Sequence, residues 1–251
     1  MRKKVIIGNW KMNKTIAEAV KFTEEFIEFA SEVASKDIVV GICPTFLSLP
    51  AVKKVSKDML VAAQNCHYAT NGAYTGEISI PMLQEIGIKY CLIGHSERRQ
   101  YNNETNVTCN EKLHALLKNQ ITPIYCVGEN LQQYEEGLSK EVVKTQVVVG
   151  LDGLSNEQVA SMIIAYEPVW SIGTGKSASI EIAEDICKFI RNVIEEKFNK
   201  EVAEKVTIQY GGSVKAENSR AYLSCPNIDG VLVGGASLEV DSFVKLISNI
   251  L

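Results

Sequence analysis

The chain has 251 residues, of which 46% are apolar and 22% are charged. This length is sufficient for one α/β barrel or for two smaller domains with a buried core. The net charge of −4 provides no overall basic field for nucleic acid or for an acidic membrane surface. The N-terminal sequence Met-Arg-Lys-Lys-Val lacks the apolar segment of a signal peptide, and no apolar run approaches membrane-spanning length. We therefore expect a cytoplasmic protein without a nucleic-acid or membrane partner.

The seven cysteines are scattered singly along the chain and form no CxxC pair. An odd number without paired spacing argues against a disulfide framework and against a zinc site. Several of these thiols lie in or at the end of apolar runs, where cysteine behaves as a small apolar side chain. We expect structural cysteines, no metal and no other cofactor.

Eight short runs rich in β-branched residues recur with centres about 32 residues apart, which is roughly the size of a strand–helix unit. Several are apolar at consecutive positions, as expected for strands that are covered on both faces. The predicted strands are Val5–Ile7, Ile38–Ile42, Leu60–Ala63, Tyr90–Ile93, Ile121–Val127, Met162–Tyr166, Val206–Gln209 and Val231–Val233.

Helical patterns lie between the predicted strands. Ala19–Ala34 and Ile182–Phe198 both place apolar residues at helical spacing, with charged residues on the other face. Eight strand–helix repeats without a linker or a break in composition predict a single closed (β/α)8 barrel over residues 1–251. A doubly wound sheet is the competing α/β fold, but such sheets normally stop near about six strands.

Polar residues follow the first and fourth predicted strands. Asn9 and Lys11 follow the first strand, and Lys11 is either a solvated loop residue or a cation that stabilises a phosphate or a developing oxyanion. His95 follows the fourth strand and begins a short predicted helix, whose N-terminus disfavours a charged imidazole. Glu97, in the first turn of that helix, is a candidate acid–base group or the partner of a nearby cation.

Glu167 stands where the sixth predicted strand ends, before Pro168. Proline cannot continue the strand ladder and keeps the preceding residue out of the α region. The loop that follows contains Trp170 and two glycines. We interpret Glu167 as a base beneath a mobile lid, although a strand-end glutamate that faces solvent would have the same sequence pattern.

Glycine turns follow the last two predicted strands, at Gly211-Gly212-Ser213 and Gly234-Gly235. Backbone N–H groups are accessible there because no Cβ intervenes, and a helix after Gly235 would add the positive end of its dipole. Each turn alone is explained by local geometry. As a consecutive pair in a barrel, the two turns predict a phosphate site.

Together these motifs closely resemble those of the triosephosphate isomerase family, in the same order over the whole chain. The matching segments are Gly-Asn-Trp-Lys-Met-Asn at 8–13, Ala-Gln-Asn at 63–65, Gly-Ala-Tyr-Thr-Gly-Glu at 72–77, Ile-Gly-His-Ser-Glu-Arg-Arg at 93–99, Cys-Val-Gly-Glu at 126–129, Ala-Tyr-Glu-Pro-Val-Trp at 165–170, Ile-Gly-Thr-Gly-Lys at 172–176, Tyr-Gly-Gly-Ser-Val at 210–214 and Asp-Gly-Val-Leu-Val-Gly-Gly-Ala-Ser at 229–237.

The resemblance implies interconversion of dihydroxyacetone phosphate and glyceraldehyde 3-phosphate through an enediolate, in glycolysis and gluconeogenesis. It implies that Glu167 is the base, that neutral His95 polarises the carbonyl and moves a proton between the oxygens, and that Lys11 with Asn9 stabilises negative charge. It also implies which residues hold the phosphate. These are Gly173, Ser213, Gly234 and Gly235.

The resemblance further implies a lid and a homodimer. Trp170 would contact Glu129 when the lid is open, and Tyr210 and Ser213 would bind the closed lid. The lid comprises Pro168, Val169, Trp170, Ser171, Ile172, Gly173, Thr174, Gly175 and Lys176. The dimer would form by insertion of the loop around Tyr74, Thr75 and Gly76 beside the first catalytic loop of the neighbouring copy.

The chain departs from the family pattern at Ser171, where alanine is more usual, and at Ile180 and Ala216, where proline is common. These departures concern the rate of lid motion and local stability rather than the chemistry. Two alternatives stay open, namely another phosphate-binding barrel enzyme, such as an epimerase or an aldolase, and a barrel that has lost its activity and serves as a scaffold. An aldolase would need a lysine on the sixth or seventh strand, and the intact polar residues argue against a scaffold.

Overall fold

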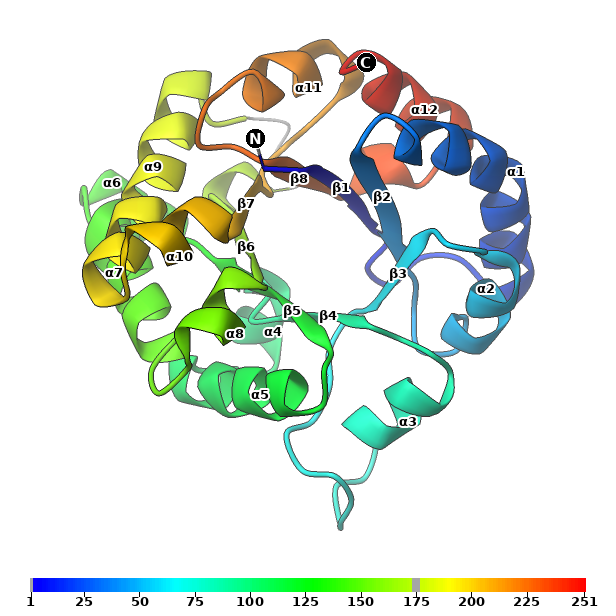
Figure 1. The fold of residues 1–251 in the computed structure, drawn as a ribbon, viewed down its shortest axis with the longest axis horizontal. Helices are drawn as coiled ribbons and strands as arrows, with labels where there is room; N and C mark the ends of the chain where they lie inside the picture. The colour runs from blue at the N-terminus through cyan, green and yellow to red at the C-terminus, as the bar shows by residue number, and fades with distance from the viewer. Residues whose placement is uncertain (1, 173–176) are drawn as a thin grey trace.

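The computed structural model describes residues 2–172 and 177–251, and these form a closed barrel of eight parallel strands surrounded by helices (Figure 1). Each strand pairs with the next along the chain, and β8 pairs with β1, which confirms the predicted barrel. The strands are β1 (Lys4–Asn9), β2 (Ile38–Cys43), β3 (Leu60–Ala63), β4 (Tyr90–Ile93), β5 (Thr122–Val127), β6 (Ile163–Tyr166), β7 (Thr207–Tyr210) and β8 (Gly230–Val233).

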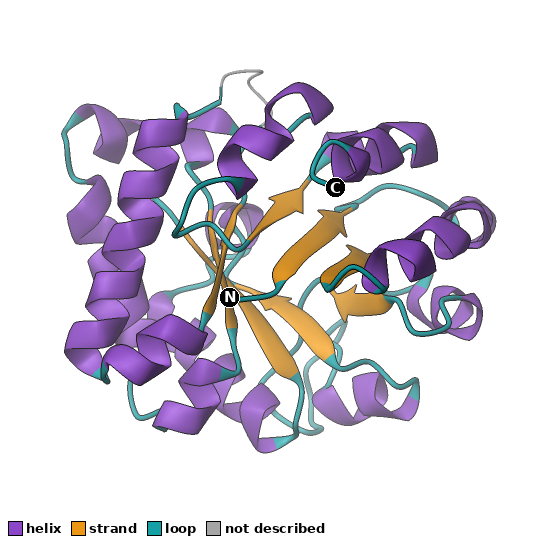
Figure 2. Cartoon of the chain, turned by 45° about the horizontal axis from the view of Figure 1, so that its top comes forward, coloured by secondary structure: helices purple, strands orange, loops and turns teal. Residues whose placement is uncertain are grey.

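Helices surround the strands on all sides, as the view in Figure 2 shows. They are α1 (Ile16–Ala34), α2 (Leu49–Val55), α3 (Ile80–Glu85), α4 (Ser96–Tyr101), α5 (Asn106–Lys118), α6 (Leu131–Glu135), α7 (Ser139–Gly150), α8 (Asn156–Ala160), α9 (Ile180–Lys197), α10 (Lys200–Lys205), α11 (Ala216–Leu223) and α12 (Val240–Ser248), with short 3₁₀ turns η1 (Val169–Ser171) and η2 (Gly235–Ser237). Across the described part of the chain, none of these helices is both long enough and apolar enough to span a membrane.

Alternation along the strands produces two separate cores. Val5 and Ile7 belong to a cluster in which every fully buried member is a strand residue, so this cluster fills the barrel interior. Ile6, between them, packs in the larger cluster with helix residues such as Phe22 and Phe26. Burial on both faces explains why the strands are apolar at consecutive positions in the sequence.

Local capping extends the helices beyond their apolar patterns. The helix predicted from Ala19 begins at Ile16, because the Thr15 side chain accepts from the Glu18 N–H and the Glu18 carboxylate accepts from the Thr15 N–H. The helix predicted from Ile182 begins at Ile180, where the Ser179 hydroxyl caps the first turn. The predicted strand boundaries differ from those observed by no more than two residues at either end.

The connection after β3 is long and irregular. Residues 64–79 link β3 to α3 without regular structure and project away from the barrel (Figure 1). Gly72 and Gly76 have φ values of +142° and +90° in this loop, a region that suits glycine. Tyr74, Thr75 and Gly76, in this loop, are exposed to solvent.

Candidate active site

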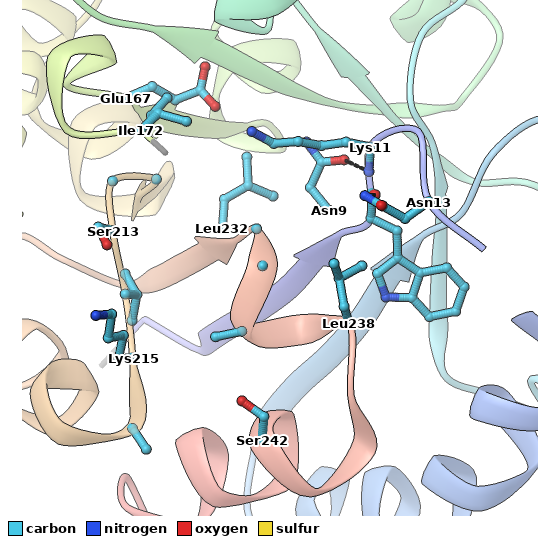
Figure 3. A pocket seen from close by; sticks show the side chains of 18 of the residues that line it. Asn9, Lys11, Asn13, Glu167, Ile172, Ser213, Lys215, Leu232, Leu238 and Ser242 are labelled. Carbon is cyan, nitrogen blue, oxygen red and sulfur yellow. Dashed lines mark hydrogen bonds between the residues drawn. The ribbon is translucent and has the colours of Figure 1, made fainter. Parts of the chain in front are cut away.

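The parallel strands bring their C-terminal ends to one mouth, and a cavity of about 840 Å³ opens there (Figure 3). Its lining comes from the ends of β1, β4, β6, β7 and β8, as the barrel predicts. The predicted site residues among the lining are Asn9, Lys11, His95, Glu167, Ile172, Ser213, Gly234 and Gly235. The structure thus brings together side chains that are far apart in the sequence.

Glu167 is 2% exposed and points into this cavity. One carboxylate oxygen lies 2.9 Å from Nε2 of His95, and the other accepts from the Ser96 N–H at 3.1 Å. Burial by itself raises the pKa of Glu167, but His95, the Ser96 N–H and Lys11 lower it by more, so the pKa lies below its ordinary value. The carboxylate is therefore ionised near neutral pH, as a general base must be. The solvent-facing alternative for Glu167 is wrong.

His95 caps the N-terminus of α4, and its Nδ1 accepts from the Glu97 N–H at 3.2 Å. A nitrogen that accepts a hydrogen bond carries no proton, so this contact places the ring proton on Nε2, which faces Glu167. Burial lowers the pKa of His95, while the Glu167 carboxylate raises it by more, and the net direction is above the ordinary value. The two influences oppose each other, and in the neutral ring the Glu97 contact selects the tautomer that carries its proton on Nε2.

Lys11 has a φ of +54°, and the Asn9 side chain accepts from its backbone N–H at 3.1 Å. Its carbonyl accepts from the Gln64 amide at 2.8 Å. The ammonium extends across the cavity toward the side where Glu167 lies (Figure 3) and pairs with Glu97 at 2.7 Å. Lys11 is thus a held cation rather than a solvated loop residue.

Glu97 does not line the main cavity and is partly exposed behind Lys11. It lines a neighbouring cavity of about 360 Å³ instead. Of the two roles considered from the sequence, this position favours the partner of a cation over an acid–base group.

The two glycine turns also line the cavity, and Gly211 lies beside Glu167, because a Cβ there would lie 3.0 Å from Cγ of Glu167. A Cβ at Gly235 would meet no atom within 4 Å, and one at Gly234 would lie 3.7 Å from Cε of Lys11, so a ligand can approach both backbones. Gly212 is different, because a Cβ there would lie 2.2 Å from the Tyr210 hydroxyl oxygen. The helix predicted after Gly235 is only the three-residue η2, and the longer α12 begins at Val240. A helix therefore does begin at Gly235, but it is a single 3₁₀ turn, and backbone donors remain the basis of an anion site.

The described start of the lid is packed against the barrel. The Trp170 indole donates to a Glu129 carboxylate oxygen at 2.9 Å, as the resemblance implies for an open lid, and the Tyr166 hydroxyl contacts the same oxygen at 3.1 Å. Ser171 is buried, and its hydroxyl donates to the Pro168 carbonyl at 2.9 Å. The remaining predicted lid residues, Gly173, Thr174, Gly175 and Lys176, lie outside the described residues.

Sequence reasoning did not single out several buried polar residues beneath the site. Glu104 accepts from the Gly94 N–H at 3.0 Å and pairs with the Lys112 ammonium, which also contacts Asn65. Gln146 donates to and accepts from the backbone of Gly128. The available signal was a glutamine on the buried face of α7, between Val143 and Val147. No group of three possible metal ligands occurs in the ranges that the structure describes.

Comparison with known proteins agrees with this geometry. A family model described as triosephosphate isomerase matches residues 4–250. The chain belongs to the triosephosphate isomerase family. It is 51% identical over 247 residues to a triosephosphate isomerase of Acetivibrio thermocellus, with 98% of this chain and 97% of the relative covered. It is 50% identical over 249 residues to one from Streptococcus equi subsp. zooepidemicus and 48% identical over 249 residues to one from Carboxydothermus hydrogenoformans, with 98% of both chains covered in each case. The resemblance noted in the sequence is confirmed.

Proposed function

We propose that the protein is an aldose–ketose isomerase that interconverts dihydroxyacetone phosphate and D-glyceraldehyde 3-phosphate. The observation that carries the proposal is the 2.9 Å contact between His95 and Glu167 in a cavity that Lys11 and two glycine turns also line. A base, a hydrogen-bond donor, a cation and an anion site are the parts that proton transfer beside a carbonyl requires. Membership of the triosephosphate isomerase family supports this triose phosphate as the substrate.

In the first step, Glu167 removes a proton from the carbon next to the carbonyl. The electrons of the broken C–H bond form a C=C bond, and those of the carbonyl π bond move to its oxygen, which gives an enediolate. The lowered pKa of Glu167 ensures that the carboxylate is ionised before this step. Glu167 then returns the proton to the neighbouring carbon.

In the same step, His95 donates from Nε2 to the carbonyl oxygen and moves a proton between the two substrate oxygens. A substrate between the two side chains would weaken the influence of Glu167, which raises the pKa of His95. Burial and the Lys11 ammonium would then favour the neutral ring. Lys11 stabilises the charge on the oxygen, with Asn9 holding its backbone. We assign Glu97 to holding the Lys11 ammonium rather than to proton transfer.

The phosphate is assigned to the part of the cavity wall that the two glycine turns form. Ser213, Gly234 and Gly235 line that wall, and Gly235 leaves open space for an anion. Gly173 completes the proposed set from the lid. Backbone N–H donors suit a protein whose net charge is −4, because they bind a dianion without an excess of basic side chains.

The lid protects the enediolate in this proposal. An enediolate phosphate that meets water can expel its phosphate, so closure excludes a side reaction as well as water. The Trp170–Glu129 hydrogen bond would hold the lid away from the site until the substrate binds.

The activity is tested by supplying the purified protein with glyceraldehyde 3-phosphate and following dihydroxyacetone phosphate with an NADH-dependent reductase. Unphosphorylated glyceraldehyde is the control, because it lacks the anion that the glycine wall would bind. We expect rapid turnover of the phosphate ester and far slower turnover of the control. Absence of turnover, as a scaffold would give, or equal turnover of both compounds would contradict the proposal.

We also infer that the protein acts as a cytoplasmic homodimer. The loop with Tyr74, Thr75 and Gly76 projects from the barrel (Figure 1), and the apolar side chains of Met12 and Leu47 are 94% and 81% exposed. Such apolar side chains favour burial against a second copy. Thr75→Glu should therefore give a monomeric protein in analytical ultracentrifugation. Its isomerase activity should be lower than that of the parent protein. A monomeric parent protein with full activity at micromolar concentration would contradict the dimer.

A further inference from the structure

A chain of hydrogen bonds runs behind the site from the strand end of His95 to the strand end of Glu167. It consists of Arg99 on α4, Tyr125 on β5 and Gln146 on α7, and we call these three residues the β5 network. The pairing of β5 with β4 and β6 ends at Ile93 and Tyr166, and one further backbone hydrogen bond joins the Glu167 N–H to the Val127 carbonyl at 2.7 Å. The β5 network adds side-chain contacts to these backbone bonds.

At the His95 end, the Arg99 guanidinium holds two backbone carbonyls. Its Nε donates to the carbonyl of Gly94 at 2.7 Å, and its Nη2 donates to that of Cys126 at 3.2 Å. Gly94 precedes His95 and has a φ of +74°, and a Cβ there would lie 2.9 Å from Nη2 of Arg99. The guanidinium therefore ties the residue before His95 to the end of β5.

At the Glu167 end, the Gln146 side chain holds both polar groups of Gly128. It accepts from the Gly128 N–H at 2.6 Å and donates to the Gly128 carbonyl at 3.0 Å. A Cβ at Gly128 would lie 1.8 Å from the carbonyl oxygen of Glu167, so these two backbones are in direct contact. Gln146 therefore fixes the residue against which the Glu167 backbone packs.

Tyr125 joins the two ends. Its hydroxyl accepts from Nη2 of Arg99 at 3.4 Å and donates to the Gln146 carbonyl at 2.8 Å. Burial raises the pKa of Tyr125 well above its ordinary value, so the hydroxyl stays protonated and can donate. The chain of contacts is then continuous from Gly94 to Gly128.

We propose that Arg99, Tyr125 and Gln146 are positioning residues that set the separation between His95 and Glu167. The inference rests on the proposed function, because it assumes that these two side chains transfer protons. Proton transfer requires a fixed geometry, and a displacement of about 1 Å can lower a rate about 100-fold. Residues that hold the reacting groups from behind are as necessary for that geometry as the groups themselves.

The test uses Tyr125→Phe, which removes only the hydroxyl, and Gln146→Met, which removes both contacts to Gly128 at similar volume. The control is Thr23→Val, which removes a buried hydroxyl that donates to the Ala19 carbonyl at 2.8 Å within α1. We expect kcat to fall about tenfold in each network variant with KM within about twofold. The double variant should lose less than the product of the two single losses, because the residues act as one unit.

A second measurement separates positioning from a general loss of stability. The carboxyl carbon of Glu167 is followed by ¹³C NMR against pH in the substrate-free protein. In the network variants, a looser contact with His95 should raise the pKa of Glu167. In Thr23→Val, the pKa of Glu167 should equal that of the parent protein. Turnover and titration equal to those of Thr23→Val in both network variants would overturn the inference. If Glu167→Gln keeps near-normal turnover in the same assay, the proposed function itself is wrong instead.

Discussion

A carboxylate that is almost completely buried and still ionised requires compensating partners, and Glu167 has them in His95 and the Ser96 N–H. The balance between burial and these contacts determines its charge. Because the contacts prevail, the folded protein binds a proton at Glu167 less readily than the unfolded chain does.

Titration of Glu167 tests this balance. The pKa of Glu167, measured by ¹³C NMR of its carboxyl carbon, should lie below the ordinary value of 4.5. The Glu167→Gln variant assigns the resonance. Since the pKa is depressed by folding, the stabilisation is complete above about pH 4.5 and is lost as pH falls through the folded-state pKa. The difference in unfolding free energy between the parent and Glu167→Gln should shrink correspondingly toward acid pH. A Glu167 pKa above 4.5 would show that burial prevails.

The buried Glu104–Lys112 pair should matter more for stability than the exposed pairs do. Glu104→Gln removes the negative charge beside the buried Lys112 ammonium and leaves it with neutral partners, and we expect a loss of about 3–5 kcal/mol in urea unfolding. Glu201→Gln, which breaks the exposed pair with Lys205, is the matched control and should leave the urea midpoint unchanged. Equal effects of the two substitutions would refute this distinction.

At the scale of elements, the strands were the most predictable part of the chain. Leu60–Ala63 and Tyr90–Ile93 match β3 and β4 at both ends, because burial on both faces makes the whole strand apolar. Helix starts were less predictable, since the first residues of α1 and α9 are set by the caps Thr15 and Ser179 rather than by the apolar periodicity. The helix expected after Gly235 is the single 3₁₀ turn η2, because a glycine-rich sequence does not determine how far a helix extends.

Two of the departures from the family pattern lie at the first residues of helices. Ile180 begins α9 and Ala216 begins α11, and the preceding residues Ser179 and Lys215 are extended. Proline suits this position, because its φ is already helical and the missing N–H has no helical partner. Ile180→Pro and Ala216→Pro should each stabilise the protein by about 0.4–1 kcal/mol and raise Tm by about 2 °C. A decrease of Tm in calorimetry would contradict this reasoning.

For the whole molecule, barrel closure is what made the site predictable. Asn9 ends β1, and His95 and Glu167 follow β4 and β6, so a closed parallel barrel brings them to the same mouth irrespective of their separation in sequence. The supporting contacts could not be predicted in the same way. Gln146 and Glu104 lie on or beside helices, and their partners depend on how α7 and α5 pack against the strands.

The central claim is that Glu167 transfers the proton, and the most direct test is to replace this carboxylate. Triose phosphate is incubated in D₂O with the parent protein and with Glu167→Gln, and ¹H NMR follows both turnover and deuterium incorporation at the carbon next to the carbonyl. The account predicts rapid incorporation by the parent, and a loss of at least about 1,000-fold in both rates for Glu167→Gln with little change in substrate binding. A Glu167→Gln protein that exchanges and isomerises at nearly the parent rate would contradict it.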